Sequence, residues 1–270
     1  MHLDLHIHSD ASDGDLGAAA VVDAAVQANL DVIAIADHDT VAGVQDAIEA
    51  ARDHPVQVIP AIEMSATVNQ VELHILGYFV DHTDPELLDH TDAAVHRRES
   101  RLREMVDRLA TEGLDIPFEA VRAMSGGRGT LGRPHLARAI MEAGHVESVP
   151  EAFARFIGND HPAYVPAALI DPGEAIGLIE RAGGISVWAH PPRRLVAEFL
   201  PALRTSGLRG LEIYRPRASA SHLRELERVA KENGLLVSGG SDWHGPEQGL
   251  LGEFRVESED VSDLLSAGGI

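Results

Sequence analysis

The feature that most constrains the fold is an alternation of short apolar segments with helix-like segments along most of the chain. Strands are expected at residues 3–8, 31–36, 56–62, 72–79, 185–189, 209–213 and 235–239. Helices are expected at residues 16–29, 41–53, 172–182 and 220–233, after Leu195, and around 258–265. Repeated strand–helix units are typical of a mainly parallel sheet with helices outside it. Six or seven such strands predict an α/β barrel, complete or incomplete.

The alternation stops in the middle of the chain. A long helix is expected to start at Pro85, and further helices near Arg133 and Pro150. A turn-rich linker is expected near Ser125-Gly126-Gly127. This stretch reads as a helical insertion into the barrel. We therefore expect a first barrel part, an insertion and a second barrel part at residues 1–80, 81–165 and 166–270.

Composition excludes several classes of protein. The chain has 270 residues, 44% of them hydrophobic, and can bury a large core. It has no cysteine, so a metal site must use His, Asp and Glu, which suit Mn, Fe, Mg or Zn. No apolar run approaches the ~20 residues of a membrane span, and no leader is evident, so we expect a cytoplasmic protein with no membrane partner. A net charge of −21 argues against long nucleic acid as a partner.

The first strand carries a pair of histidines, in Asp4-Leu5-His6-Ile7-His8. Side chains two apart in a strand point the same way, so Asp4, His6 and His8 share one face. Two adjacent imidazoles are half of a metal site. Paired histidines also occur on ordinary surfaces, so the remaining ligands must come from elsewhere.

Further metal-capable side chains follow other predicted strands. Asp13 follows the first strand, His38 the second, Glu63 the third and His190 the 185–189 strand. The last strand leads to Asp242 and His244, and His74 lies within the fourth strand. In strand–helix folds the chemistry lies at the carboxyl ends of the strands. The set therefore predicts a polynuclear metal site, although His74 in an apolar strand also fits a core histidine.

These motifs together resemble one known family. The ordered set is Asp4–Ser9 (DLHIHS), Ser12–Gly14 (SDG), Ala36–Asp39 (ADHD), the Glu63 strand, Leu73–Tyr78 (LHILGY), Ala189–Pro191 (AHP) and Ser241–His244 (SDWH). It is similar to the polymerase-and-histidinol-phosphatase (PHP) family of metal-dependent phosphoesterases. Gly132–Arg138 (GRPHLAR) resembles a motif in the insertion of the branch that includes nucleoside 3′,5′-bisphosphate phosphatases and 5′–3′ exoribonucleases.

The resemblance implies a fold and a set of metal ligands. The fold would be α/β, a distorted (β/α)7 barrel with a helical insertion, holding two or three divalent ions. The first ion would be held by His6, His8, Glu63 and Asp242. The second would be held by Asp13, His38 and His244, and the third by His74 and His190 with Glu63 as the bridge. Some members have a histidine where this chain has Asp13. Because aspartate is a harder ligand than histidine, manganese is the favoured ion, and Fe, Zn and Mg stay open.

The resemblance also suggests substrate contacts. Arg133 and His135 would bind phosphate, with His135 a candidate proton donor to the leaving oxygen. Arg193 follows His190 and could clamp a phosphate, and His161 could reach the site from the end of the insertion. Arg215 stands in Tyr-Arg-Pro where the family has Tyr-His-Pro, which leaves its role open.

Other charged residues of the insertion have an ordinary explanation. The arginines and glutamates of the long helix predict a solvent-exposed face with i,i+4 ion pairs. The arginines are Arg97, Arg98, Arg101, Arg103 and Arg108. Arg138 reads as a surface or ion-pair residue.

The favoured reaction is hydrolysis of a phosphomonoester on a small nucleotide by a metal-activated hydroxide. Hydrolysis of a nucleoside 3′,5′-bisphosphate would give the nucleoside 5′-monophosphate and phosphate. The alternative is a 5′–3′ exoribonuclease on short RNA. A C–N hydrolase is less favoured, because an amide substrate needs no arginine clamp. A non-catalytic metal-binding module is also less favoured, because every expected ligand is present. The expected partner is a small phosphorylated nucleotide or short oligonucleotide, with no obligatory protein partner.

Overall fold

The fold is built on one mixed sheet, described here from a computed structural model of residues 1–125 and 129–270. The predicted linker at Ser125-Gly126-Gly127 therefore lies largely outside the described residues. In the described part the sheet has eight strands in the order β7-β6-β5-β4-β3-β2-β1-β8. Their bounds are β1 His2–Ile7, β2 Val32–Ile35, β3 Gln57–Val68, β4 Val71–Tyr78, β5 Ile185–Trp188, β6 Gly210–Tyr214, β7 Leu236–Gly239 and β8 Val256–Glu257.

Strand β4 runs against its neighbours, whereas the sequence predicts a mainly parallel sheet. The pairs β1–β2, β2–β3, β5–β6 and β6–β7 are parallel, but β4 is antiparallel to both β3 and β5. Only Asn69 and Gln70 separate β3 from β4, and both have positive φ, 50° and 65°. Two such residues form a tight hairpin, while a parallel pair needs a connection of about a dozen residues. The short connection therefore decides the direction of β4.

The barrel is closed by the segment that follows β7. The backbone N–H of Asp242 donates to His6 O at 2.9 Å, and that of His8 donates to Trp243 O at 2.9 Å. At Gly240 an added Cβ would lie 2.4 Å from His6 Cβ, so only glycine permits this approach. The nearly closed sheet confirms the predicted distorted barrel, with β8 as an additional short strand on β1.

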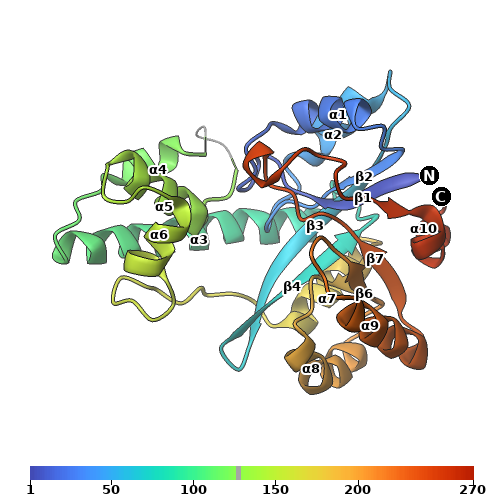
Figure 1. Cartoon of the computed structure of the whole chain (residues 1–270). Coiled ribbons are helices and arrows are strands. Elements are labelled where there is room, and N and C mark those ends of the chain that lie inside the picture. Colours follow the sequence, from blue (N-terminus) through green and yellow to red (C-terminus); the bar gives the residue numbers. More distant parts are fainter. Residues whose placement is uncertain (126–128) are drawn as a thin grey trace.

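Helices surround the sheet (Figure 1). Those of the barrel are α1 Ala18–Gln27, α2 Val44–Ala51, α7 Pro172–Arg181, α8 Arg193–Thr205, α9 Ala220–Asn233 and α10 Ser262–Gly268, with short helices η2 Pro246–Gln248 and η3 Ser258–Val261. Val21 and Val22 of α1 pack with Ile33 and Ile35 of β2, for example. Both faces of β1 are buried, as expected for a strand with helices on one side and a filled barrel on the other.

The middle of the chain forms a group of helices beside the barrel (Figure 1). They are α3 Pro85–Thr111, α4 Phe118–Ala123, α5 Arg133–Glu142, α6 Val149–Ala152 and the π-helix η1 Phe153–Ile157. Helix α3 begins at Pro85 because Asp84 caps it, accepting from Leu87 N at 2.9 Å. These helices share a hydrophobic cluster that includes Leu102, Leu109, Leu136 and Ile140.

This helical group is tied to the loops that carry metal-capable residues. Thr130 Oγ1 donates to His38 O at 2.9 Å, and Thr130 N donates to Ala11 O at 2.8 Å. Arg138 of α5 pairs with Asp15 at 2.7 Å. Both loops therefore depend on the helical group for part of their hydrogen bonding.

The expectation that Arg98 faces solvent is wrong. Its Nε donates to Asp39 Oδ2 at 2.8 Å and its Nη2 to Ser65 Oγ at 2.8 Å, with only 15% of the side chain exposed. Arg103 and Arg108 do form the expected i,i+4 pairs, with Glu99 and Glu104. Arg98 stands four residues from Ala94 and from Leu102, so it lies on the buried face of α3, where Arg103 does not.

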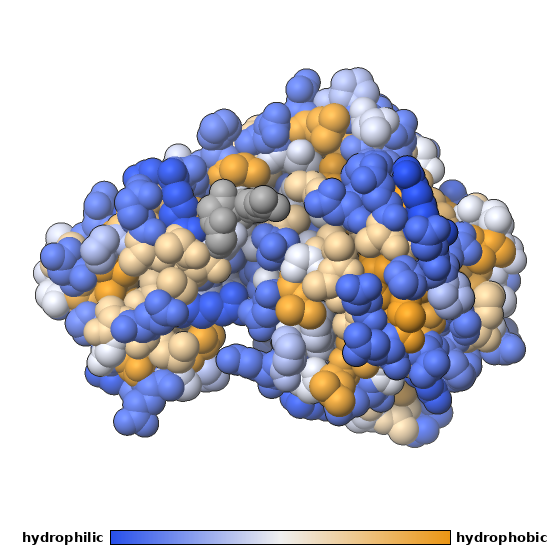
Figure 2. Space-filling model, turned by 90° about the horizontal axis from the view of Figure 1, so that it is seen from above, coloured by the Kyte–Doolittle hydropathy of each residue, from blue (hydrophilic) through white to orange (hydrophobic). Residues whose placement is uncertain are grey.

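Figure 2 shows mostly hydrophilic side chains on one face of the molecule, with apolar residues in small patches. Within residues 1–125 and 129–270, no helix is both long enough and apolar enough to span a membrane.

The buried Arg98–Asp39 pair predicts a stability difference between two arginines of α3. Arg98→Ala should lower the free energy of unfolding by about 3 kcal/mol, because it leaves a buried carboxylate without its partner. Arg103→Ala removes an exposed pair with Glu99 and the stacking of its guanidinium on Phe118, and should cost about 1 kcal/mol. Urea denaturation of both variants measures the difference, and equal losses would contradict the burial argument.

Candidate metal centre

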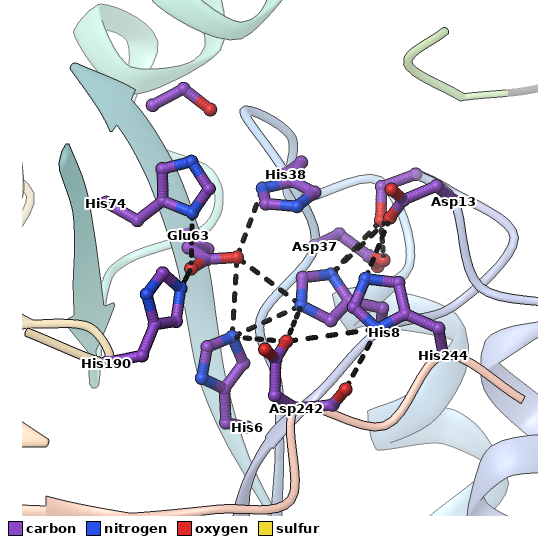
Figure 3. Close-up of polar contacts among 12 residues, drawn as sticks. His6, His8, Asp13, Asp37, His38, Glu63, His74, His190, Asp242 and His244 are labelled. Atoms are coloured by element: carbon purple, nitrogen blue, oxygen red, sulfur yellow. Dashed lines mark hydrogen bonds and ion pairs between the residues drawn. The ribbon is translucent and has the colours of Figure 1, made fainter. Parts of the chain in front are cut away.

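All the predicted metal ligands lie together at one end of the barrel (Figure 3). They lie in or after six different strands, which are β1, β2, β3, β4, β5 and β7. The residues are His6, His8, Asp13, His38, Glu63, His74, His190, Asp242 and His244. The barrel therefore brings together side chains from the whole length of the chain.

The ligand atoms form three overlapping groups, each with its atoms within 4.8 Å of one another. One group is the predicted first set. A second holds the predicted second set together with His8, and the third joins His74 to His38 and Glu63. His190 reaches this third group through its Nε2, which lies 2.9 Å from Glu63 Oε1. The groups are His6, His8, Glu63 and Asp242; His8, Asp13, His38 and His244; and His38, Glu63 and His74.

Glu63 lies at the centre of these groups. Its Oε1 faces His74 Nδ1 at 3.0 Å and His190 Nε2 at 2.9 Å. Its Oε2 faces His38 Nδ1 at 3.1 Å and His6 Nε2 at 3.3 Å. Burial alone would raise the pKa of this fully buried carboxyl group, but the facing imidazoles hold the pKa well below its usual range. Glu63 is thus an ionised carboxylate with imidazoles facing both of its oxygens.

The polar atoms of the cluster fit metal ions better than hydrogen bonds. In the described part of the chain, Asp13 Oδ1, His38 Nδ1 and Glu63 Oε2 are buried without a hydrogen-bond partner. The Nε2 atoms of His6 and His8 lie only 3.2 Å apart. Buried polar atoms without partners are costly and rare, and lone pairs that converge are satisfied when they share a cation. Histidine and carboxylate donors of this kind suit Mn, Fe or Zn.

A second carboxylate, Glu212, orients the ligands and was not predicted as a site residue. It is fully buried in the middle of β6. Its Oε1 accepts from His6 Nδ1 at 2.8 Å, and its Oε2 accepts from His190 N at 2.7 Å. Metal-bound histidines usually donate their other ring N–H in this way. A charged residue within the otherwise apolar run Gly210–Tyr214 was the available sequence signal.

Two aspartates also hold the backbone and side chains around the ligands. Asp37 accepts from Ser9 N at 2.7 Å and from Ser12 Oγ at 2.6 Å, and Ser12 Oγ lies 3.4 Å from His8 Nδ1. Asp4 accepts from Ser241 N at 2.8 Å, and burial raises the pKa of Asp4 to about 7. Asp4 therefore holds the segment after β7 against β1.

Among residues 1–125 and 129–270, three of the eight non-glycine residues with positive φ lie beside or within the cluster. Asp39, His190 and Asp242 have φ values of 53°, 33° and 57°, in the left-handed region that non-glycine residues rarely adopt. Each lies in a loop that follows a strand, beside or within the cluster. Strain of this kind persists only where the surrounding structure enforces it, and it marks functional sites.

The carboxylates leave several imidazoles protonated. Burial alone would lower their pKa values, but Glu63 raises the pKa of His74 to about 10, and Asp13 raises that of His244 to about 9. Glu212 and Glu63 likewise hold the pKa of His6 well above its usual range. His38 differs, because burial lowers its pKa to about 3.

The predicted substrate residues have more varied surroundings. His135 is buried at the start of α5, where its Nδ1 accepts from Gly132 N at 3.0 Å, and burial lowers its pKa. Arg133 pairs with Asn159 at 2.7 Å. Their roles toward substrate stay predictions.

The remaining predicted substrate residues lie farther along the chain. Arg193 pairs with Glu225 of α9, and His161 donates to Ala154 O at 2.9 Å. Arg215 is near the cluster, with its Nε 4.0 Å from Glu212 Oε2. Of these three, Arg215 lies beside a residue that holds the metal ligands.

A barrel with buried histidines and carboxylates converging at its strand ends defines the class of metal-dependent hydrolases. The PHP domain pattern matches residues 4–156, and the chain belongs to this family. It is 34% identical over 248 residues to a 5′-3′ exoribonuclease of Haemophilus influenzae, covering 90% of each chain. It is 28% identical over 268 residues to a 3′,5′-nucleoside bisphosphate phosphatase of Chromobacterium violaceum, covering 97% of this chain and 93% of the relative.

The fold is also found in a solved structure. A Bifidobacterium adolescentis protein, predicted to be a metal-dependent phosphoesterase, superposes with a TM-score of 0.90 and 32% identity, covering 99% of this chain and 96% of its own. Together these relatives identify the chain as a metal-dependent hydrolase of phosphate esters.

The cluster predicts that metal content and activity are lost together. His8→Ala and Asp242→Ala each remove a ligand from the Glu63 group, so both should abolish metal loading and turnover. Metal analysis of protein purified without a histidine tag, combined with a phosphatase assay, measures both. His145→Ala, in an exposed loop, should change neither. Activity retained in the Asp242→Ala protein would contradict the ligand assignment.

The raised imidazole pKa values predict that metal binding releases protons. At pH 7 the metal-free protein carries protons on His6, His74 and His244, and a metal ion must displace them. Apparent affinity should therefore rise as pH increases from 7 toward 9, since fewer protons compete. Calorimetric titration with Mn²⁺ in two buffers of different ionisation enthalpy measures the proton count. Identical heats in both buffers would contradict the prediction.

Proposed function

We propose that this protein removes the 3′-phosphate from nucleoside 3′,5′-bisphosphates, giving nucleoside 5′-monophosphates and phosphate. The observation that carries the proposal is the ring of imidazoles around the buried carboxylate of Glu63. Such an arrangement suits hydrolysis of phosphate esters, where charge must be balanced on attacking and leaving oxygens. The relative of Chromobacterium violaceum is named for the bisphosphate reaction and aligns with 97% of this chain.

The proposal includes two or three divalent ions, with manganese favoured and Fe, Zn or Mg open. His6, His8, Glu63 and Asp242 would hold the first ion. Asp13, His38 and His244 would hold the second, and His74 and His190 the third, with Glu63 shared. When bound, the ions would supply Lewis-acid stabilisation and lower the pKa of water. Glu212 would keep the ring of His6 turned toward this site through its Nδ1.

His135 is the proposed proton donor to the leaving oxygen. Its Nδ1 accepts a hydrogen bond from Gly132 N, so its proton in the neutral form is on Nε2. Burial lowers the pKa of His135, which keeps the ring neutral at pH 7. Arg133, next to it in the same motif, would bind phosphate oxygens.

A 5′–3′ exoribonuclease acting on short RNA is the second candidate. The relative of Haemophilus influenzae named for this activity is 34% identical. The net charge of −21 favours a small substrate over a long polyanion, which must otherwise approach against repulsion.

A direct comparison of substrates tests the proposal. Phosphate release from 3′,5′-bisphosphoadenosine is compared with mononucleotide release from a 5′-phosphorylated RNA oligomer, in Mn²⁺, Mg²⁺ or Zn²⁺. We expect the bisphosphate to have the higher kcat/KM, and a chelator to abolish turnover. A preference for the oligomer would establish the second candidate, and absence of turnover of both substrates would overturn both.

A further inference from the structure

A cavity of about 200 Å³ lies directly beside the proposed metal centre. His190 and Glu212 form its wall toward the metal ligands. Arg215, Arg217 and His222 line it where the chain passes from β6 to α9. We call these three residues and the cavity the arginine pocket. Three basic side chains therefore gather beside the cluster in a strongly acidic chain.

The arginine pocket contains hydrogen-bond donors that the described residues do not use. Arg215 Nε and His222 Nδ1 are buried and have no hydrogen-bond partner among residues 1–125 and 129–270. The Nε of Arg215 is 4.0 Å from Glu212 Oε2, too far for a hydrogen bond, whereas Arg228 makes a short pair with Glu232. Leaving a buried donor without an acceptor is costly, so these groups point to a ligand that brings acceptors.

The backbone supports the same conclusion. Arg217 has a φ of 62°, which is strained for a residue with a Cβ. Strained, non-glycine positions are found where a loop is held for binding. The tripeptide Arg215-Pro216-Arg217 also lines a second, wider cavity of about 790 Å³ that includes Asp242 and Phe254. Arg215 and Arg217 therefore lie between two cavities beside the cluster.

Charge decides which cavity suits an anion. The wider cavity is also lined by Glu247 and Glu253, which repel phosphate. The acidic group of the arginine pocket is Glu212, and both of its oxygens already accept hydrogen bonds, from His6 and from His190. An anion is therefore favoured on the side of Arg215, Arg217 and His222.

We propose that the arginine pocket binds the phosphate that the enzyme does not hydrolyse, the 5′-phosphate of a nucleoside 3′,5′-bisphosphate. This inference rests on the proposed function. An arginine fork and an imidazole match the oxygens of a phosphate dianion and would hold it while the 3′-phosphate lies at the metal centre. Arg215 takes the place of the histidine of the family motif, so this chain adds a longer, permanently charged donor.

Binding of the reaction product tests the pocket without turnover. Adenosine 5′-monophosphate and adenosine are titrated calorimetrically into the metal-loaded protein. Arg215→Ala should weaken binding of the monophosphate about 10- to 100-fold, the loss expected for a hydrogen bond to a charged group, with little change for adenosine. Arg224→Ala removes the same charge from an exposed position of α9 and should leave both affinities unchanged.

Kinetics provide the second readout. The ratio of kcat/KM for 3′,5′-bisphosphoadenosine to that for adenosine 3′-monophosphate should fall about 10-fold or more in Arg215→Ala. Arg215→Lys keeps the charge without the fork and should recover part of the ratio. An equal loss on both substrates, or unchanged binding of the 5′-monophosphate, would overturn the pocket. Absence of turnover in the wild type would overturn the proposed function, while the binding measurement would still decide whether the pocket holds phosphate.

Discussion

The interaction on which the rest of the site depends is the burial of one carboxylate among imidazoles. Glu63 is fully buried, and an isolated carboxylate there would be protonated or would destabilise the fold. Four histidines from different strands and loops face its two oxygens: His6, His38, His74 and His190. These partners lie on or after the strands that flank β3 in the sheet, so the charge of Glu63 and the formation of the sheet stabilise each other.

The helical group beside the barrel shares in the same arrangement. Asp39 follows the metal-capable His38 in a strained loop, and Arg98 of α3 neutralises it. Thr130 donates to the carbonyl of His38 itself. Helices with a hydrophobic core of their own thus position a loop of the barrel, which links the stability of the insertion to the geometry of the proposed second ion.

Much of the site could be predicted because the ligands follow strands. His6 and His8 are two residues apart in a strand, and that period alone places them on one face. The burial of Arg98 could have been inferred, because it lies four residues from Ala94 and from Leu102 on the buried face of α3. Its partner Asp39 could not, because it comes from a distant loop. Glu212 could not be assigned, because its role depends on the rings of His6 and His190, which are distant in sequence. The direction of β4 could have been inferred, since two residues cannot make a parallel connection.

The sequence by itself determined the family, the ligand types and their place at strand ends, because local period and chain order are covalent properties. Only the tertiary structure decided which ligands share a group, that Glu63 belongs to two of the three groups, and that Glu212 accepts from His6. The reason is geometric. Hydrogen bonds and metal groups depend on distances of a few ångströms, and those between β1, β6 and the segment after β7 exist only once the barrel has closed.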